Sequence, residues 1–446
     1  MAAQMILALS IIVGIHEFGH LLTAKLFGMR VEKYFIGFPP KIWSFNYKGT
    51  EYGLGSIPLG GFVKISGIID ESMDTSHINK EPESWEFRSK PAWQRLVVML
   101  GGIIFNVITG LIIFTMITFN NGETYLSKDE INKNGILALE LGLEAGFKTG
   151  DKILLINDKE WERDAELFDP NLFFDDNSTF TVLRDNQEFK ITIPDNFINK
   201  MNSREAMSSF IKARTPFSID SVYSNALKAG LTKGDKIIKV DETFIIDLYE
   251  LKTILEENKS SIIQVTINRN NNLIDKVVEI SNDATIGIKV LPEPLTFSQR
   301  KFNFNESVII GTQKAFGIVF LNIRAFGKMF SGDIDPSKNL SGPIGIAQIF
   351  GSEWDWGNFW RIVGLLSMVL AFMNLLPIPA LDGGHATFIL YEMISGKKPT
   401  EKFLEYSTRF GVIILLGLMS YVILNDIYKL FTVSYTHLTL PTKRIV

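Results

Sequence analysis

Four long apolar segments alternate with polar stretches along the chain. They run from Met5 to Phe27, from Leu96 to Phe119, from Ile362 to Leu381 and from Phe410 to Leu424. About 20 apolar residues cross the hydrocarbon core of a bilayer as a helix, so the second and third segments, which carry no charge, are long enough to span it. A polar cluster interrupts the first segment, and the fourth needs the apolar residues that follow it. We therefore expect four transmembrane helices.

Basic residues gather in the two short connections between these helices, which sets the orientation of the chain. Cytoplasmic connections carry the excess of Lys and Arg, so both connections are expected in the cytoplasm, with both termini and the long middle section outside. The residues are Arg30, Lys33, Lys41, Lys48, Lys64, Lys80, Arg88, Lys90 and Arg95 in the first connection, and Lys397, Lys398, Lys402 and Arg409 in the second.

A further apolar stretch, residues 306–330, contains Lys314, Arg324 and Lys328 at intervals. A fifth span here would place the two basic connections on opposite sides of the membrane. The sequence therefore favours an amphipathic helix that lies on the membrane surface.

The middle section, residues 122–295, contains an internal repeat. The segment Ala145–Asn157, AGFKTGDKILLIN, aligns without a gap to Ala229–Asp241, AGLTKGDKIIKVD, at an offset of 84 residues. In each copy a Gly-Asp turn leads into an alternating apolar strand. Any small β-rich domain can contain such a turn, but two aligned copies resemble PDZ domains, which bind extended chain ends by strand addition. We expect a charged linker around Asn199–Arg214 between them.

The amino-acid composition excludes some kinds of catalytic and metal-binding site. Among 446 residues there is no cysteine, so thiolate metal ligands and thiol nucleophiles are excluded. The net charge of −4 does not indicate a nucleic-acid partner. The apolar segments instead make membrane lipid the expected surroundings.

The polar cluster in the first apolar segment is HEFGH, which fits the pattern H-E-x-x-H. On a helix His16 and His20 lie one turn apart on the same face, so both imidazoles can bind one metal ion. Two imidazoles suit Zn²⁺, and Glu17 beside them can take a proton from the attacking water. A solvated helix face and a proton relay in a transporter are the alternatives. The apolar neighbours disfavour the first, because a charged group at the bilayer centre needs a partner.

A zinc site of this kind needs a third protein ligand at membrane depth. Asp382 qualifies, because it ends the third apolar segment in the sequence NLLPIPALDGGH, where Pro377 and Pro379 interrupt the helix. Taken alone, Asp382 is better explained as a helix cap or a loop charge, and the HEFGH motif makes it a ligand candidate; His385 is a rival on spacing. His77 is excluded because it lies in a charged loop.

HEFGH, NLLPIPALDGG and the tandem repeat together resemble the site-2 protease family of intramembrane zinc metalloproteases, of the regulator-of-sigma-E protease type with two PDZ domains. The resemblance reaches to about residue 431. It implies that His16, His20 and Asp382 are zinc ligands and that Glu17 is the catalytic base. It also implies that Asn374 helps to hold the substrate.

The segment Gly49–Ile65, GTEYGLGSIPLGGFVKI, resembles the membrane-associated β-hairpin of that family. The resemblance implies that this hairpin presents an edge strand to the substrate, with Ile57, Gly60 and Gly61 as substrate-binding residues. LSGPIGI, residues 340–346, is a further segment of the family. One departure is Ile103, which stands where the family's second helix often has proline, whereas Gly102 and Asn106 are retained.

The expected fold is a polytopic α-helical membrane protein with four transmembrane helices, two inserted α+β PDZ-like domains and a membrane-associated β-hairpin. The expected activity is regulated intramembrane proteolysis of single-pass membrane proteins, of anti-sigma-factor type in envelope stress signalling, and of signal-peptide remnants, in the bacterial inner membrane. A non-catalytic PDZ scaffold and a zinc-dependent transporter are the alternatives. The expected divisions are 1–121 for the first two helices, the HEFGH site and the hairpin region, 122–200 and 210–295 for the PDZ-like domains, 300–358 for the amphipathic helix and connecting segment, and 359–431 for the last two helices with the LDG motif. Residues 432–446 form an atypical tail that fits neither the last helix nor the family pattern, as expected of a non-native segment.

Overall fold

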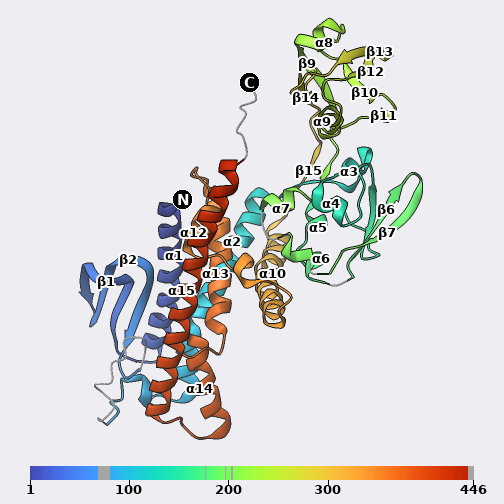
Figure 1. Ribbon diagram of the computed structural model, residues 1–446. Helices are drawn as coiled ribbons and strands as arrows, with labels where there is room; N and C mark the ends of the chain where they lie inside the picture. Colours follow the sequence, from blue (N-terminus) through green and yellow to red (C-terminus); the bar gives the residue numbers. More distant parts are fainter. Residues whose placement is uncertain (69–80, 176, 196, 202–203, 440–446) are drawn as a thin grey trace. The chain divides into compact units, whose positions relative to one another are not determined.

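The computed structural model describes residues 1–68, 81–175, 177–195, 197–201 and 204–439. The chain forms two compact units (Figure 1). The membrane unit comprises Met1–Gly122 and Lys301–Val446, and the inserted unit comprises Glu123–Arg300. His77 and the last seven residues of the expected tail lie outside the described residues.

The membrane unit is built mainly from helices. Within the described residues, five helices are long and apolar enough to cross a bilayer, namely α1, α2, α10, α13 and α15. Four of them match the four expected apolar segments, and α10 is the stretch expected to lie on the membrane surface. The elements are α1 Ala2–Leu26, β1 Val31–Tyr47, β2 Thr50–Ile65, α2 Ala92–Asn121, α10 Phe304–Ser331, α11 Pro336–Asn339, α12 Pro343–Ile349, α13 Trp356–Leu375, α14 Asp382–Ser395 and α15 Glu401–Thr439, with a 3-10 turn at Phe87–Ser89.

The third apolar segment is not one continuous helix. Helix α13 ends at Leu375, and Leu376 has extended backbone angles (φ −61°, ψ 142°). The cause is Pro377, because the residue before a proline is pushed out of the helical region. Asp382 consequently begins α14 instead of ending the third helix.

Small residues let the helices of this unit approach closely. A Cβ atom on Gly19 of α1 would lie 2.3 Å from the carbonyl oxygen of Gly101 in α2. A Cβ atom on Gly311 of α10 would lie 2.6 Å from the backbone nitrogen of Thr115 in α2. Such small-residue contacts are typical of helix packing in membranes.

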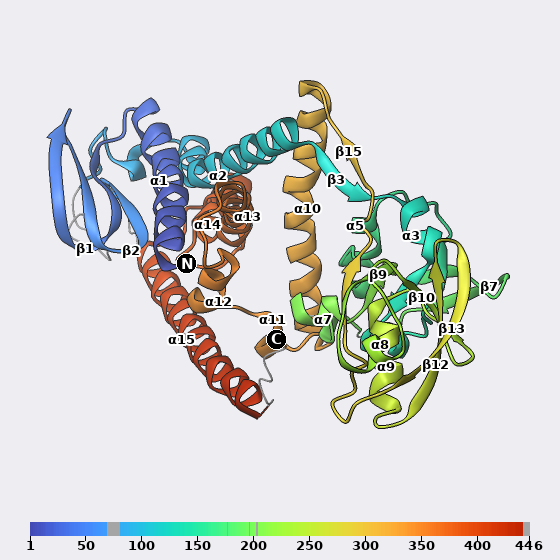
Figure 2. The ribbon, with the colours of Figure 1, turned by 90° about the horizontal axis from the view of Figure 1, so that it is seen from above.

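Figures 1 and 2 together show α10 crossing α13 instead of running parallel to it.

Strands β1 and β2 form an antiparallel hairpin that packs on α1. Their register runs from Val31 opposite Ile65 to Tyr47 opposite Thr50, with several irregularities. The hydroxyl of Tyr34 donates a hydrogen bond to the carbonyl oxygen of Gly14 in α1. The hairpin therefore lies directly against the helix that contains HEFGH.

A buried carboxylate joins α15 to the segment LSGPIGI. Asp426 is only 5% exposed. Its carboxylate accepts hydrogen bonds from the backbone nitrogens of Gly342, Ile344 and Gly345 at 2.9, 3.0 and 3.1 Å. Asp426, just after the fourth apolar segment, thus fastens the start of α12 to α15.

The inserted unit consists of two similar halves, each with its own apolar core. Strands β3 and β15, where the chain enters and leaves this unit, pair in antiparallel fashion. The elements are β3 Glu123–Leu126, α3 Lys128–Asn134, β4 Ile136–Ala138, α4 Glu140–Glu144, β5 Lys152–Ile156, α5 Asp164–Leu167, α6 Asn171–Phe174, β6 Thr179–Arg184, β7 Gln187–Thr192, α7 Arg204–Ser208, β8 Ile211–Ala213, β9 Phe217–Val222, α8 Ser224–Lys228, β10 Lys236–Val240, β11 Thr243–Phe244, α9 Leu248–Glu257, β12 Ile262–Arg269, β13 Asn272–Glu279, β14 Ile288–Pro292 and β15 Phe297–Arg300, with a 3-10 turn at Phe197–Asn199.

The internal repeat extends to individual side chains. Arg184 donates two hydrogen bonds of 2.7 Å to the carboxylate of Asp151 in the first half. Arg269 donates equivalent bonds of 2.7 and 2.8 Å to Asp235 in the second half. Both aspartates belong to the Gly-Asp turns that align in the sequence, and both are buried.

The boundary between the halves lies later than expected. Strand β8, at Ile211–Ala213, pairs with β4 of the first half. Met201, Phe210 and Ile211 also belong to the apolar core of the first half, so the first half continues past residue 200. The sequence did not reveal this, because a three-residue strand leaves no periodic pattern.

Candidate metal centre

Helix α1 places His16 and His20 side by side in the interior of the membrane unit. Both side chains are 7% exposed. Their ring centroids are 4.9 Å apart in an edge-on arrangement, and the two Nε2 atoms are 3.3 Å apart. Asp382, the first residue of α14, brings Oδ2 to 3.1 Å from His16 Nε2 and 3.3 Å from His20 Nε2. The sequence-predicted ligands therefore meet at one point.

The three atoms fit a zinc ion. Zinc bonds of about 2.0–2.1 Å in tetrahedral geometry place neighbouring ligand atoms about 3.3–3.4 Å apart, close to the three observed separations. Asp382 Oδ2 is buried and makes no regular hydrogen bond. Among the described residues, His16, His20 and Asp382 form a group of potential ligands whose atoms lie within 4.8 Å of one another. Two imidazoles and a carboxylate are a common zinc donor set.

The loop before α14 delivers Asp382 by folding tightly back on itself. A Cβ atom on Gly383 would lie 2.4 Å from the carbonyl oxygen of Leu376, and one on Gly384 would lie 2.4 Å from that of Ile378. Ala380 adopts a left-handed φ of 83° and is buried. No side chain larger than hydrogen fits at either glycine, which explains the pair that follows Asp382.

Helix α2 supports the site from the other side. His20 Nδ1 lies 2.8 Å from the carbonyl oxygen of Val98, so that carbonyl accepts the Nδ1 proton and leaves Nε2 free as a ligand. A Cβ atom on Gly102 would lie 2.4 Å from His20 Nε2 and 2.6 Å from His16 Cε1. Glycine at this position therefore makes room for the two rings.

A cavity of about 540 Å³ opens beside the three ligands. Glu17, Asn374, Gly60 and Gly61 line it. Asn374 Nδ2 lies 3.2 Å from His16 Nε2. A Cβ atom on Gly61 would lie 3.3 Å from Glu17 Cγ, so strand β2 lies directly against the glutamate. The cavity thus joins the ligands, the glutamate and the hairpin.

Ile57, the remaining expected substrate-binding residue, is not among the residues that line this cavity. It pairs with Phe38 in the hairpin, and its side chain is 44% exposed.

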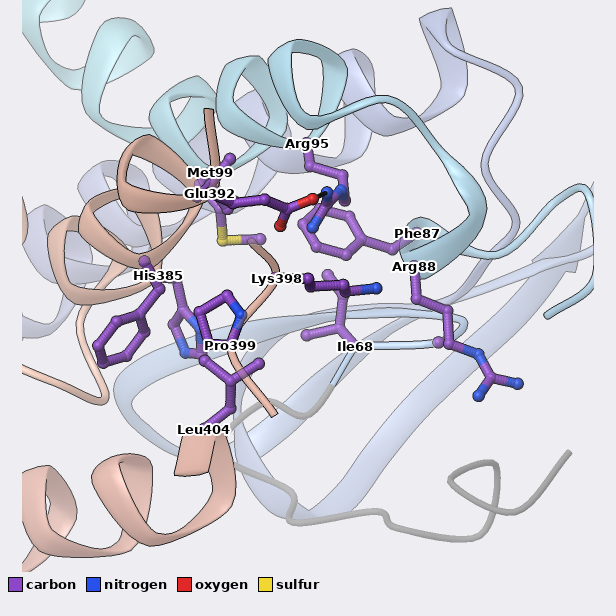
Figure 3. Close-up of a pocket in the computed structure, with 13 residues that line it drawn as sticks. Ile68, Phe87, Arg88, Arg95, Met99, His385, Glu392, Lys398, Pro399 and Leu404 are labelled. Carbon is purple, nitrogen blue, oxygen red and sulfur yellow. Dashed lines mark hydrogen bonds and ion pairs between the residues drawn. The ribbon is translucent and has the colours of Figure 1, made fainter. Parts of the chain in front are cut away.

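His385, the rival third ligand, lies between this cavity and a smaller one of about 80 Å³ and lines both. The smaller cavity contains an ion pair between Arg95 and Glu392, with the guanidinium nitrogen 2.5 Å from the carboxylate (Figure 3). The sequence counted Arg95 only as a loop charge. Its partner comes from α14, almost 300 positions later, and no local pattern connects the two residues.

Comparison with known proteins shows the family of this chain. The model of peptidase family M50 matches residues 4–418. A relative from Salmonella typhi named "Regulator of sigma E protease" is 28% identical over 96% of this chain and 98% of its own length. "Regulator of sigma-E protease RseP" of Escherichia coli is 29% identical, and a "Putative zinc metalloprotease" of Borreliella burgdorferi is 30% identical, each over the same shares. The chain therefore belongs to peptidase family M50, the site-2 protease family.

Proposed function

We propose that this chain is an intramembrane zinc endopeptidase in which His16, His20 and Asp382 hold the metal and Glu17 is the general base. One observation carries the proposal. Three ligand atoms with zinc-like separations meet beside a glutamate, and the two histidines and the glutamate lie on α1, a helix apolar enough for a bilayer. Membership of a peptidase family gives this arrangement a hydrolytic role.

Each residue of the site has a separate role in peptide hydrolysis. Zinc, when bound, supplies a Lewis acid that activates water and polarises the scissile carbonyl. Glu17 takes the proton of the attacking water and passes it to the leaving amine. Asn374 offers an amide at the cavity wall, 3.2 Å from His16 Nε2, where it can hydrogen-bond the substrate backbone.

The hairpin next to Glu17 suits an extended substrate. A helical peptide bond is shielded, and its carbonyl is already hydrogen-bonded, so a membrane-spanning substrate must unwind before cleavage. Gly60 and Gly61 in β2 line the cavity, and the strand backbone at Gly61 lies next to Glu17. An unwound substrate adds to this strand by backbone hydrogen bonds.

The relatives' names suggest the biological role. Two of them are called regulators of sigma-E protease. For this chain we infer regulated intramembrane proteolysis of single-pass proteins of anti-sigma-factor type in the inner membrane of a bacterium, with signal-peptide remnants as further substrates. The two halves of the inserted unit act as PDZ-like domains outside the cytoplasm, where they filter substrates by size or sense a new chain end. The basic connections face the cytoplasm.

A non-catalytic scaffold and a zinc-dependent transporter are less well supported. A scaffold has no need of a glutamate beside three clustered potential ligands. A transporter leaves the peptide bonds of its cargo intact, which separates it from a protease by one measurement.

Mass spectrometry of model transmembrane peptides incubated with the purified protein tests the proposal. The wild-type chain is expected to bind about one zinc ion and to cleave within the apolar segment of the peptide. Glu17→Gln keeps the zinc and loses cleavage, whereas the exposed Glu353→Gln control keeps both. Unchanged turnover in Glu17→Gln would overturn the assignment of the base.

A further inference from the structure

One face of α2 supports both histidines of the site. Val98, Gly102 and Asn106 follow each other at intervals of four residues, so they lie along one side of the helix. The carbonyl of Val98 orients His20, and Gly102 makes room for both rings. Asn106 completes the row opposite His16.

Asn106 is fully buried, with 0% exposure. Its side-chain nitrogen lies 3.1 Å from His16 Nδ1, and its side-chain oxygen is buried without a hydrogen-bond partner. Ser367 of α13 donates a hydrogen bond of 2.9 Å to the backbone oxygen of Asn106. The backbone of this residue is thus anchored, and its amide is aimed at the imidazole.

The chemistry of a metal-binding imidazole decides which end of the amide faces His16. A neutral imidazole carries one proton, and Nε2 can bind a metal only when that proton is on Nδ1. Nδ1 is then a donor and requires an acceptor. The amide oxygen and nitrogen are equal in size, so a half-turn of the amide brings Oδ1 to Nδ1 without steric cost.

We propose that Asn106 is a positioning residue that accepts the Nδ1 proton of His16 through Oδ1 and so fixes Nε2 as a zinc ligand. The inference rests on the proposed function, since it concerns the same metal site. A buried amide without a hydrogen-bond partner otherwise destabilises a membrane helix. Asn106 serves His16 as the carbonyl of Val98 serves His20.

Zinc affinity of three full-length variants, measured by competition with a chelator, tests this role. Asn106→Leu keeps the volume but offers no acceptor, and it is expected to lose about 10–100-fold in affinity. Asn106→Asp keeps an acceptor oxygen and is expected to stay within a few-fold of wild type. Thr109→Ala removes a side-chain hydrogen bond to the carbonyl of Phe105 within the same helix, away from His16, and its zinc affinity is expected to be unchanged.

The thermal unfolding of each variant is also measured without zinc. A variant with a packing defect would then unfold at a lower temperature than the wild-type protein. Wild-type affinity in Asn106→Leu would overturn the inference. Equal losses in Asn106→Leu and Asn106→Asp, with both variants folded, would also overturn it. Absence of zinc from the wild-type chain would overturn the proposed function itself, which distinguishes the two failures.

Discussion

Asp382 Oδ2 lies 3.1 Å from His16 Nε2, although the two residues come from opposite ends of the sequence. The contact joins α1 to α14, two helices that are separated along the chain by the hairpin, the inserted unit and three other long helices. A metal ion at this point would link the two ends of the membrane unit. We therefore expect zinc binding to be coupled to the folding of this unit.

We expect zinc to stabilise the membrane unit through this link. At free zinc about 1,000 times the dissociation constant, the gain in unfolding free energy is about 4 kcal/mol. Thermal unfolding of the intact protein with and without a chelator measures the gain. Asp382→Ala should unfold at the same temperature in both conditions, and the same result for wild type would contradict the prediction.

Gly102→Ala should separate zinc binding from helix stability. The added Cβ meets His20 Nε2 at 2.4 Å, so the imidazole must leave its position and zinc affinity falls at least tenfold. Alanine also raises helix propensity by about 1 kcal/mol, so the zinc-free helix remains formed. Gly317→Ala in α10, where nothing lies within 4 Å of the new Cβ, is the control and should bind zinc normally. Bound zinc per folded chain is the measurement.

The sequence predicted the local half of the metal site. His16, Glu17 and His20 are spaced by one helical turn, and that spacing alone places them on one face. The sequence did not decide whether Asp382 or His385 is the third ligand, because separation along the chain does not show which side chain lies near the two histidines. The tight loop with its two glycines brings the Asp382 carboxylate to both imidazoles.

Two expected elements differ in detail from the structure. Pro377 and Pro379 indicated a break in the third segment, but the sequence did not show that α13 ends at Leu375 and that Asp382 begins a new helix. The linker expected around Asn199–Arg214 contains β8, which pairs with β4, a strand more than 70 positions earlier. Membership of the M50 family, in contrast, followed from short motifs that need no tertiary information.

The second half of the inserted unit should lose stability in acid through Asp235. Burial alone would raise the pKa of Asp235, but hydrogen bonds from Arg269 and from the backbone of Thr232 outweigh it and lower the pKa below its usual value. The carboxylate is therefore harder to protonate in the folded state. Its contribution is complete above the unfolded pKa near 4 and is lost as the pH falls through the lower folded pKa.

Hydrogen exchange of residues 217–292 in the intact protein, corrected for intrinsic pH dependence, measures this effect. Asp235→Asn is expected to lower protection by about 3 kcal/mol at neutral pH, since Arg269 loses its charged partner. The variant should also lose most of the pH dependence below 4. Glu256→Gln on the surface of α9 should behave like wild type, and a wild-type pH profile in Asp235→Asn would contradict the role of the pair.

Asp426 should hold the LSGPIGI segment to α15 chiefly through its second carboxylate oxygen. Oδ2 accepts the backbone hydrogens of Ile344 and Gly345, and Oδ1 accepts that of Gly342. Asp426→Asn replaces one of these oxygens by a donor, which faces backbone N–H groups and cannot bond them. The expected cost is about 1–3 kcal/mol, because buried N–H groups lose their acceptor. Faster hydrogen exchange of residues 340–349 reports the release, whereas Ser420→Ala, which removes a bond within α15 only, should leave that exchange unchanged. If Asp426→Asn also exchanges like wild type in residues 340–349, the carboxylate does not hold this segment.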